Sequence, residues 1–371
     1  MQHFFPFGCP RPTAFYLLLY LSTFALHQAL MHYVLAGSVY VTWATLFPGS
    51  GPTPRRQQPL AAALTDWMPF MLSAAITAGV APLLFVQVLY PREFYTANSL
   101  LGWRWMVVIP VLVAAFYLLY LLKSPILDRW PKAARCSVAC TVSACFLFVG
   151  FCWTANHLLA NQPSAWPQVY VSGKLPFMAP EAVSRMLIWT GGAFVSLAWL
   201  GAWQLRMQPN LDEPEQQLEM RRLAVMAWSG LTLATFASIT YAWQRPEVWE
   251  AVRQPMSLPY LLLAVIAMFV LGAAWNGLLR APAHSRWLWI AGTGWLVALF
   301  CSCVLREAIR WTQLDPAALY PRHAAAAQIG GFGVFILVGA VAFGLIAFCI
   351  GLVRRELHAH QRDAGRGPVG N

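Results

Sequence analysis

Residues 105–123 read WMVVIPVLVAAFYLLYLLK, and within this stretch only the final residue, Lys123, carries a charge. A helix of about 20 apolar residues crosses about 30 Å of hydrocarbon and satisfies its backbone hydrogen bonds internally. The stretch is therefore typical of a transmembrane helix. It decides the fold class, because similar runs recur along the whole chain.

Nine stretches of this kind are present, and all 14 Asp and Glu residues lie in connectors or at stretch ends. Hydrophobic residues make up 59% of the chain and charged residues 11%, which is typical of an integral membrane protein. We predict an all-α, polytopic membrane helical bundle of about nine helices, a single membrane domain over 1–371 with a cytoplasmic tail at 354–371. The predicted spans are residues 13–47, 66–90, 105–123, 134–160, 184–206, 222–243, 259–280, 286–308 and 328–353.

The first predicted span, residues 13–47, would form a helix of about 52 Å at about 1.5 Å per residue. Such a helix must project from the bilayer, tilt strongly or break. The span lacks the short apolar core and small-residue cleavage site of a secretory signal. We therefore expect it to be a permanent part of the bundle.

Lys and Arg are distributed unevenly between the two sides of this predicted topology. The side with the C-terminus carries 15 of the 25 basic residues, so the positive-inside rule places the N-terminus outside and the C-terminus in the cytoplasm. The net charge of +11 then reflects topology and attraction to anionic lipids. No basic run is interleaved with aromatics on a soluble segment, so no nucleic-acid partner is expected.

The cysteines do not form a recognised cofactor motif. Eight are present, without a C-x-x-C pair or a C-x-x-C-H motif, so we predict neither covalently attached haem nor a metal site. A phosphate-binding loop of the G-x-x-x-x-G-K-[ST] type is also absent from the sequence, which argues against nucleotide-driven transport.

Histidines within the spans are the first candidates for a cofactor site. His27 and His157 could ligate a haem between the first and fourth spans, because neutral imidazole is the commonest protein ligand of haem iron. His32 follows His27 by five residues, about 140° around a helix, so the two cannot face the same haem. The alternative is that each imidazole hydrogen-bonds to a neighbouring helix.

A second candidate site lies at the end of the eighth span, where Arg306, Glu307 and Arg310 fall within two helical turns. Arg306 and Arg310 share a helix face, and Glu307 can pair with Arg310 at i+3. One interpretation is an interfacial ion-pair anchor. The other is a contact for a quinone oxygen, a lipid headgroup or a partner, to which further residues on the same predicted side could contribute. These are Glu181, Arg185, Arg245, Glu247 and Glu250.

Three short motifs resemble subunit I of the cytochrome bd quinol oxidases. They are Phe24–His27, reading FALH, residues 293–298, reading TGWLVA, and residues 328–330, reading QIG. The likeness covers the whole chain and is closer to relatives of that subunit that lack oxidase features. It implies a location in the bacterial cytoplasmic (inner) membrane, haem b and quinone as cofactors, and other respiratory subunits, including cytochromes, as partners.

The chain departs from that family at its haem and proton-path positions. Leu299 stands where the oxidases have a haem-ligating Glu, residues 185–189 lack the expected haem His, and residues 106–122 lack the expected glutamates. His27 alone resembles a haem ligand of the family. Oxygen reduction needs several redox centres and a proton route, so we do not predict an oxygen reductase.

Three functions remain open on the sequence. The favoured one is a membrane subunit of a quinone-linked respiratory electron-transfer complex, catalytic only as part of that complex. The second is a haem-free scaffold or anchor subunit of a membrane complex. The third is a solute carrier, which would need a polar cavity at the membrane midplane near Asn276, His32 or Gln87.

Overall fold

The structure is a computed structural model that describes residues 9–47, 58–174, 180–207 and 213–328, with single residues at 333, 337, 339–341, 344, 348 and 351. Contacts divide the chain into two units, residues 1–319 and residues 320–371. All the elements discussed below belong to the first unit, except that helix α14 (Pro316–Gln328) begins in it and ends in the second. Most of the predicted ninth span, 328–353, falls outside the described residues.

Eight segments of the described chain are long and apolar enough to cross a membrane. This confirms the prediction of a multi-pass helical membrane protein. The spans are α1 (Arg11–Leu46), α2 (Pro59–Leu89), α4 with α5 (Trp103–Met106 and Val108–Lys123), α7 (Lys132–Ala160), α9 (Pro180–Arg206), α10 (Glu213–Gln244), α12 (Leu258–Arg280) and α13 (Ser285–Gln313).

Helix α1 is a central helix of the first unit. It runs unbroken for 36 residues, about 54 Å at about 1.5 Å per residue, so of the three alternatives for the first span, a break is excluded. It packs against α2, α7, α9 and α13. Buried side chains on α1 can therefore reach four other helices.

Two glycines allow the backbones of α9 and α10 to approach closely. A Cβ atom built on Gly191 would lie 2.7 Å from the backbone oxygen of Gly230, and one on Gly230 would lie 2.6 Å from the backbone oxygen of Gly191. Such distances leave no room for a side chain, and small residues allow membrane helices to approach this closely. The two glycines therefore hold α9 and α10 together as a pair.

Several connectors that the sequence interpretation treated as irregular contain short helices. They are α3 (Pro91–Leu101), α6 (Pro125–Asp128), η2 (Pro163–Ala165), α8 (Trp166–Ser172) and α11 (Pro246–Arg253). Each has proline at its first or second position, where the missing N–H group is not needed.

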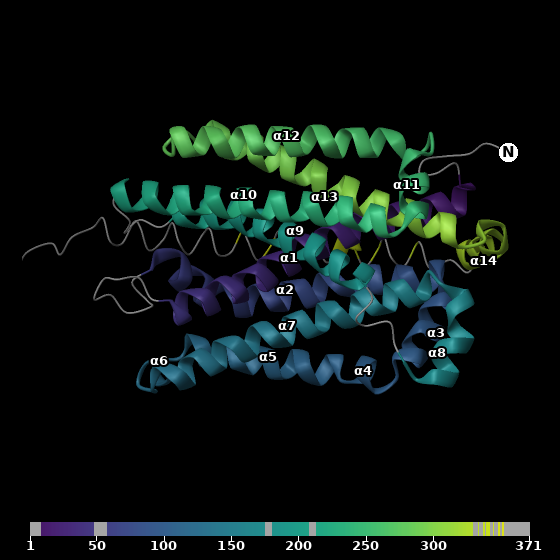
Figure 1. The fold of residues 1–371 in the computed structure, drawn as a ribbon, viewed down its shortest axis with the longest axis horizontal. Coiled ribbons are helices and arrows are strands. Elements are labelled where there is room, and N and C mark those ends of the chain that lie inside the picture. Colours follow the sequence, from purple (N-terminus) through teal and green to yellow (C-terminus); the bar gives the residue numbers. More distant parts are fainter. Residues whose placement is uncertain are drawn as a thin grey trace, which may run out of the picture. The chain divides into compact units, whose positions relative to one another are not determined.

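Three of these connectors lie at the same end of the bundle. The chain alternates direction along the long helices, which places α3, α8 and α11 together at one end and α6 at the opposite end (Figure 1). We call the first the capped end. It contains the start of α1 and α9 and the ends of α2, α7, α10 and α13, and it holds the most extensive cluster of buried ionisable groups in the described chain.

Candidate functional site

The centre of the candidate site is Glu307 on α13, whose side chain is 0% exposed. Its carboxylate accepts hydrogen bonds from Tyr90 Oη at 3.0 Å, Arg306 Nη1 at 2.9 Å and Arg310 Nη1 at 3.2 Å. The predicted i+3 pair of Glu307 and Arg310 is confirmed. The ion pairs of the interfacial-anchor alternative are therefore present, but the carboxylate is buried, so these partners must offset its desolvation.

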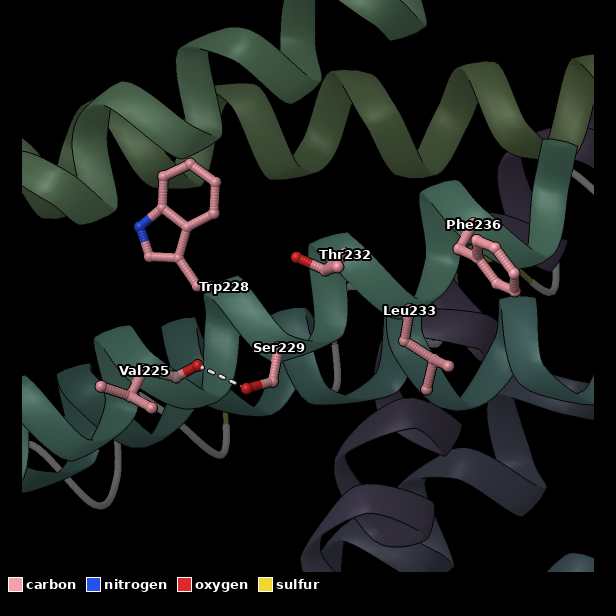
Figure 2. Close-up of a pocket in the computed structure, with 6 residues that line it drawn as sticks. All are labelled: Val225, Trp228, Ser229, Thr232, Leu233 and Phe236. Atoms are coloured by element: carbon pink, nitrogen blue, oxygen red, sulfur yellow. Dashed lines mark hydrogen bonds between the residues drawn. The ribbon is translucent and has the colours of Figure 1, made fainter.

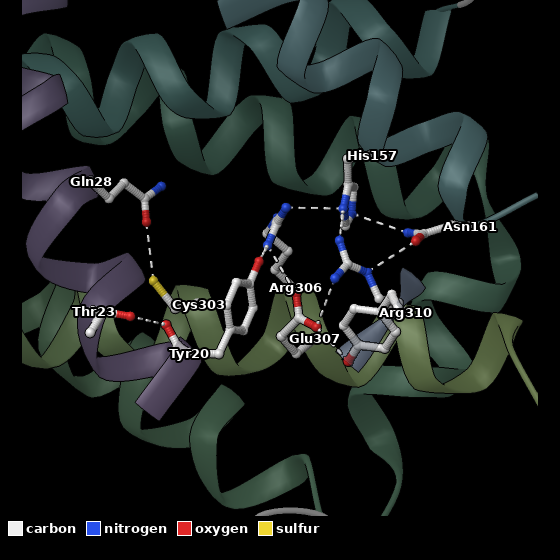
Figure 3. A network of polar contacts seen from close by, with 10 residues as sticks. Tyr20, Thr23, Gln28, His157, Asn161, Cys303, Arg306, Glu307 and Arg310 are labelled. Carbon is white, nitrogen blue, oxygen red and sulfur yellow. Dashed lines mark hydrogen bonds and ion pairs between the residues drawn. The ribbon is translucent and has the colours of Figure 1, made fainter. Parts of the chain in front are cut away.

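His157 on α7 faces both arginines (Figure 3). Its Nδ1 atom accepts from Arg306 Nη2 at 3.0 Å and from Arg310 Nη2, and its Nε2 atom lies 3.1 Å from the side-chain amide of Asn161. The imidazole is buried at 3% exposure. The structure therefore joins two residues that the sequence had assigned to different candidate sites, His157 and Arg310.

The cluster contains more hydrogen-bond donors than acceptors. A guanidinium has no acceptor atom, so His157 Nδ1 carries a lone pair and the neutral ring carries its proton on Nε2. Asn161 Oδ1 accepts from Arg310 Nε at 3.1 Å, which leaves the amide nitrogen of Asn161 facing the N–H of His157. If the Asn161 amide were rotated, its nitrogen would instead face the N–H of Arg310 Nε, and two donors would again meet. Arg306 Nε is also buried without a partner in the described chain.

Aromatic rings and hydroxyl groups complete the surroundings of the two arginines. The Arg306 guanidinium lies 4.6 Å from the centre of the Phe24 ring and donates from Nη1 to Tyr20 Oη at 2.9 Å. The Arg310 guanidinium lies 4.4 Å from the centre of the Tyr90 ring. Cation–π contacts of this kind stabilise a desolvated guanidinium. With His157 neutral, two arginines and one carboxylate leave the cluster with a net positive charge.

A third buried arginine lies nearby on α9. Arg185 donates from Nη1 to Tyr241 Oη at 3.1 Å and stacks on the same ring at 5.3 Å. Among the described residues, no carboxylate lies within ion-pair distance of Arg185. It therefore adds to the excess of positive charge at the capped end.

Three of the remaining residues predicted on this side, Glu181, Arg245 and Glu247, form a separate group of ion pairs near the surface. Arg245 binds Glu181 and also Glu247, at 3.3 Å from its Nε atom. Burial alone would lower the pKa of Arg245, but the hydrogen bonds and negative charges of the two glutamates raise it. Glu250 forms no ion pair with any described residue, and these residues do not extend the cluster.

His27 and His32 lie away from the cluster and contact other helices. His27 Nδ1 donates to the backbone oxygen of Ala75 at 2.9 Å. His32 Nδ1 lies 2.9 Å from Ser196 Oγ, which also accepts from Trp295 Nε1 at 2.8 Å. These contacts agree with the alternative in which each imidazole hydrogen-bonds to a neighbouring helix.

The predicted haem pair, His27 and His157, has a specific difficulty of fit. Ligation of iron through His157 would require either Nδ1 to leave Arg306 and Arg310 or Nε2 to leave Asn161. A buried donor that loses its acceptor costs about 1–3 kcal/mol. The haem assignment stays a prediction, but His157 as placed is a hydrogen-bonding residue.

Two cavities accompany these features. One is an open groove of about 540 Å³ along α10, lined by Val225, Trp228, Ser229, Thr232, Leu233 and Phe236 (Figure 2). The other is a cavity of about 10 Å³ beside Arg310. The carrier residues Asn276, His32 and Gln87 line neither of them.

The sequence interpretation missed Tyr20, Tyr90 and Asn161 as members of the site. Asn161 follows His157 by four residues, so their shared helix face was a usable signal. Tyr90 ends α2 and Tyr20 lies on α1, and nothing in the local sequence distinguishes them. A scan against models of known protein families finds no match, and a search of curated proteins finds no significant match.

Proposed function

We propose that this protein is a membrane subunit of a quinone-linked respiratory electron-transfer complex, and that the cluster around Glu307 contacts the quinone headgroup. The observation that carries the proposal is the surplus of buried donors. A quinone carbonyl is an acceptor without a proton to donate, so it complements the unpartnered N–H of Arg306 and the amide conflict at Asn161.

The position of the cluster supports the same assignment. Glu307 lies six residues from the end of α13, about 9 Å at about 1.5 Å per residue. A headgroup at this depth can reach polar donors while its isoprenoid tail remains in the hydrocarbon. In the proposed topology the capped end faces the outside of the bacterial cytoplasmic membrane.

Binding of quinone analogues to the purified protein tests this proposal. Short-chain ubiquinone and menaquinone analogues are titrated against wild type, Arg306→Gln and a matched control, Arg222→Gln, at a half-exposed arginine on α10. Loss of a charge-assisted hydrogen bond of about 1.5–3 kcal/mol predicts at least about tenfold weaker binding for Arg306→Gln. A wild-type protein that binds neither analogue, or an Arg306→Gln protein that binds as tightly as the control, contradicts the proposal.

Optical spectra address the haem that the family resemblance implies. The protein, purified with its partners, is measured oxidised and dithionite-reduced, alongside His27→Ala and His157→Gln variants. Bands lost only in His27→Ala support a haem at the residue that resembles a family ligand. Quinone binding without haem bands places the redox cofactors in partner subunits.

A second candidate function is a cofactor-free anchor subunit, and the groove on α10 favours it. The groove exposes Trp228 and Phe236 beside the small polar residues Ser229 and Thr232, and membrane helices associate through such small residues. An anchor would co-purify with partner subunits but would bind no quinone analogue. The same titration therefore separates the two functions.

A further inference from the structure

The small cavity beside Arg310 lies against the face of the cluster that points toward α3. Five of its lining residues are polar and four are apolar. The polar ones are Tyr90, Glu93, Asn156, Asn161 and Arg310. A polar cavity of about 10–15 Å³ holds about one water when two or more polar groups face it, and this one has a volume of about 10 Å³.

Glu93 supplies an unsatisfied acceptor at this cavity. It lies in the first turn of α3, directly after the connection from Tyr90, and its Oε2 atom is buried with no hydrogen-bond partner among the described residues. A buried polar atom without a partner costs about 1–3 kcal/mol, so such atoms are rare and usually bind a water or ligand.

The neighbouring amides do not bind Glu93 in the structure. Asn156 donates from Nδ2 to Asn98 Oδ1, and the side chain of Asn161 contacts Arg310 and His157. A water in the cavity could donate a hydrogen bond to Glu93 Oε2 and accept one from Arg310, which lines the same cavity. A single molecule would then connect the buried cluster to a carboxylate on a connector helix.

We propose that one ordered water occupies this cavity and that Glu93 exchanges protons through it between the buried cluster and the aqueous phase at the capped end. The inference rests on the proposed function for the origin of the protons, the hydroxyl groups of a quinol. The step is a proton transfer alone: an O–H bond of the water breaks as an O–H bond forms on Glu93. The water regains a proton from the hydroxyl of Tyr90, which lines the same cavity. Tyr90 regains its proton from the quinol hydroxyl, and Glu93 releases its own to the solvent.

Charged and titratable groups surround Glu93 from each neighbouring element. Arg310 on α13 and Tyr90 at the end of α2 line the same cavity, and His157 on α7 contacts Arg310. Arg92, the preceding residue on α3, stacks on the Trp166 ring of α8 at 5.6 Å. Arg310 therefore places a permanent positive charge at the same cavity as Glu93.

Infrared difference spectroscopy during pH cycling tests the water and the carboxyl group without any turnover. We expect a carboxyl band that is absent in Glu93→Gln and Glu93→Leu, and a single-water O–H band that shifts in H₂¹⁸O. Glutamine keeps an acceptor oxygen, so Glu93→Gln should retain the water band, whereas Glu93→Leu should lose it. Asp66→Asn is the matched control, because Asp66 is an exposed carboxylate paired with Lys123 at the opposite end, and both bands should persist.

Quinol oxidation by the native complex tests the transfer itself. Glu93→Gln should lower kcat by about 10²-fold, the usual contribution of a positioned acid or base, with unchanged KM and unchanged binding of the quinone analogue. A Glu93→Leu protein that keeps the water band, or a Glu93→Gln complex with wild-type kcat, overturns the inference. Failure of the analogue to bind wild type contradicts the proposed function instead, while the infrared bands still decide whether the water site exists.

Discussion

Two Glu–Arg pairs with the same i,i+3 spacing differ in almost every other respect. Glu307 and Arg310 on α13 are 0% and 4% exposed, whereas Glu219 and Arg222 on α10 are 4% and 53% exposed. The first arginine also contacts a histidine, an asparagine and an aromatic ring. Among the described residues, the second arginine hydrogen-bonds to its glutamate alone. Identical local spacing therefore permits either a buried, shared ion pair or a half-solvated one.

The contrast shows that the neighbouring helices, and not the spacing of the pair, determine whether such an ion pair is buried or exposed. At Glu307, donors arrive from α2 and from α13 itself, and the arginines are shared with α7. At Glu219, the Oε2 atom is buried without a partner in the described chain while Arg222 extends outward. Breaking the two pairs in parallel should therefore have very different consequences.

The largest effect is expected for Arg310→Met. The substitution leaves Glu307 buried with one ion-pair partner fewer and removes donors from His157 and Asn161, which should destabilise the protein by about 3 kcal/mol. Urea or thermal unfolding in detergent, monitored by circular dichroism, measures the change. A decrease in the free energy of unfolding below about 1 kcal/mol would mean that Arg310 contributes no more than an exposed ion pair does.

His157→Leu should have the next largest effect. It removes the acceptor shared by Arg306 and Arg310, and a buried donor without an acceptor costs about 1–3 kcal/mol. His157→Asn is the matched variant, because its amide oxygen can take the place of Nδ1 and should restore part of the loss. Equal unfolding midpoints for the two variants would contradict a role of His157 as a hydrogen-bond acceptor.

Arg222→Met is the counterpart of Arg310→Met and should cost about 0–1 kcal/mol, because its guanidinium is half exposed. Added salt should reduce the difference from wild type further, since exposed charges are screened. The Arg310→Met difference should persist in salt. An equal salt dependence of the two variants would mean that burial does not determine how much each ion pair contributes to stability.

The smallest effect is expected for Glu247→Gln in the pair with Arg245. A backbone N–H hydrogen bond and the charge of Arg245 lower the pKa of Glu247, so its contribution is present at neutral pH and is lost as the pH falls through the lowered pKa. Wild type and variant should differ slightly in unfolding midpoint at neutral pH and converge in acid. A difference that grows on acidification would contradict this sign.

Local sequence predicted the helices well because their signal is local. Uncharged runs of 18 or more residues define spans, and the structure extends most of the first eight predicted spans at one or both ends, as in α10, which begins at Glu213 and not at residue 222. Polar helix ends such as residues 213–221 carry no hydropathy signal. For the same reason the amphipathic connector helix α3, which carries Glu93, was not predicted.

The site was predictable only in part. Arg306, Glu307 and Arg310 were identified because they are close in sequence, and His157 because histidine is rare within spans. Their meeting was not predictable, since Arg310 and His157 are 153 residues apart and no periodicity links one helix to another. Glu307 lies near a helix end, as expected, but its complete burial was not predictable from the local sequence.

The amino-acid sequence alone is enough to identify a multi-pass helical membrane protein, since apolar length and the absence of mid-span acids are properties of single segments. It also determined the i,i+3 and i,i+4 pairs, because helix geometry sets which neighbours share a face. The tertiary structure is needed to see which pair is buried and which aromatic ring covers which arginine. It also shows that Tyr90, His157 and Glu307 converge. Those contacts depend on how separate helices pack, and the packing buries the Glu307 pair while it leaves the arginine of the Glu219 pair half exposed.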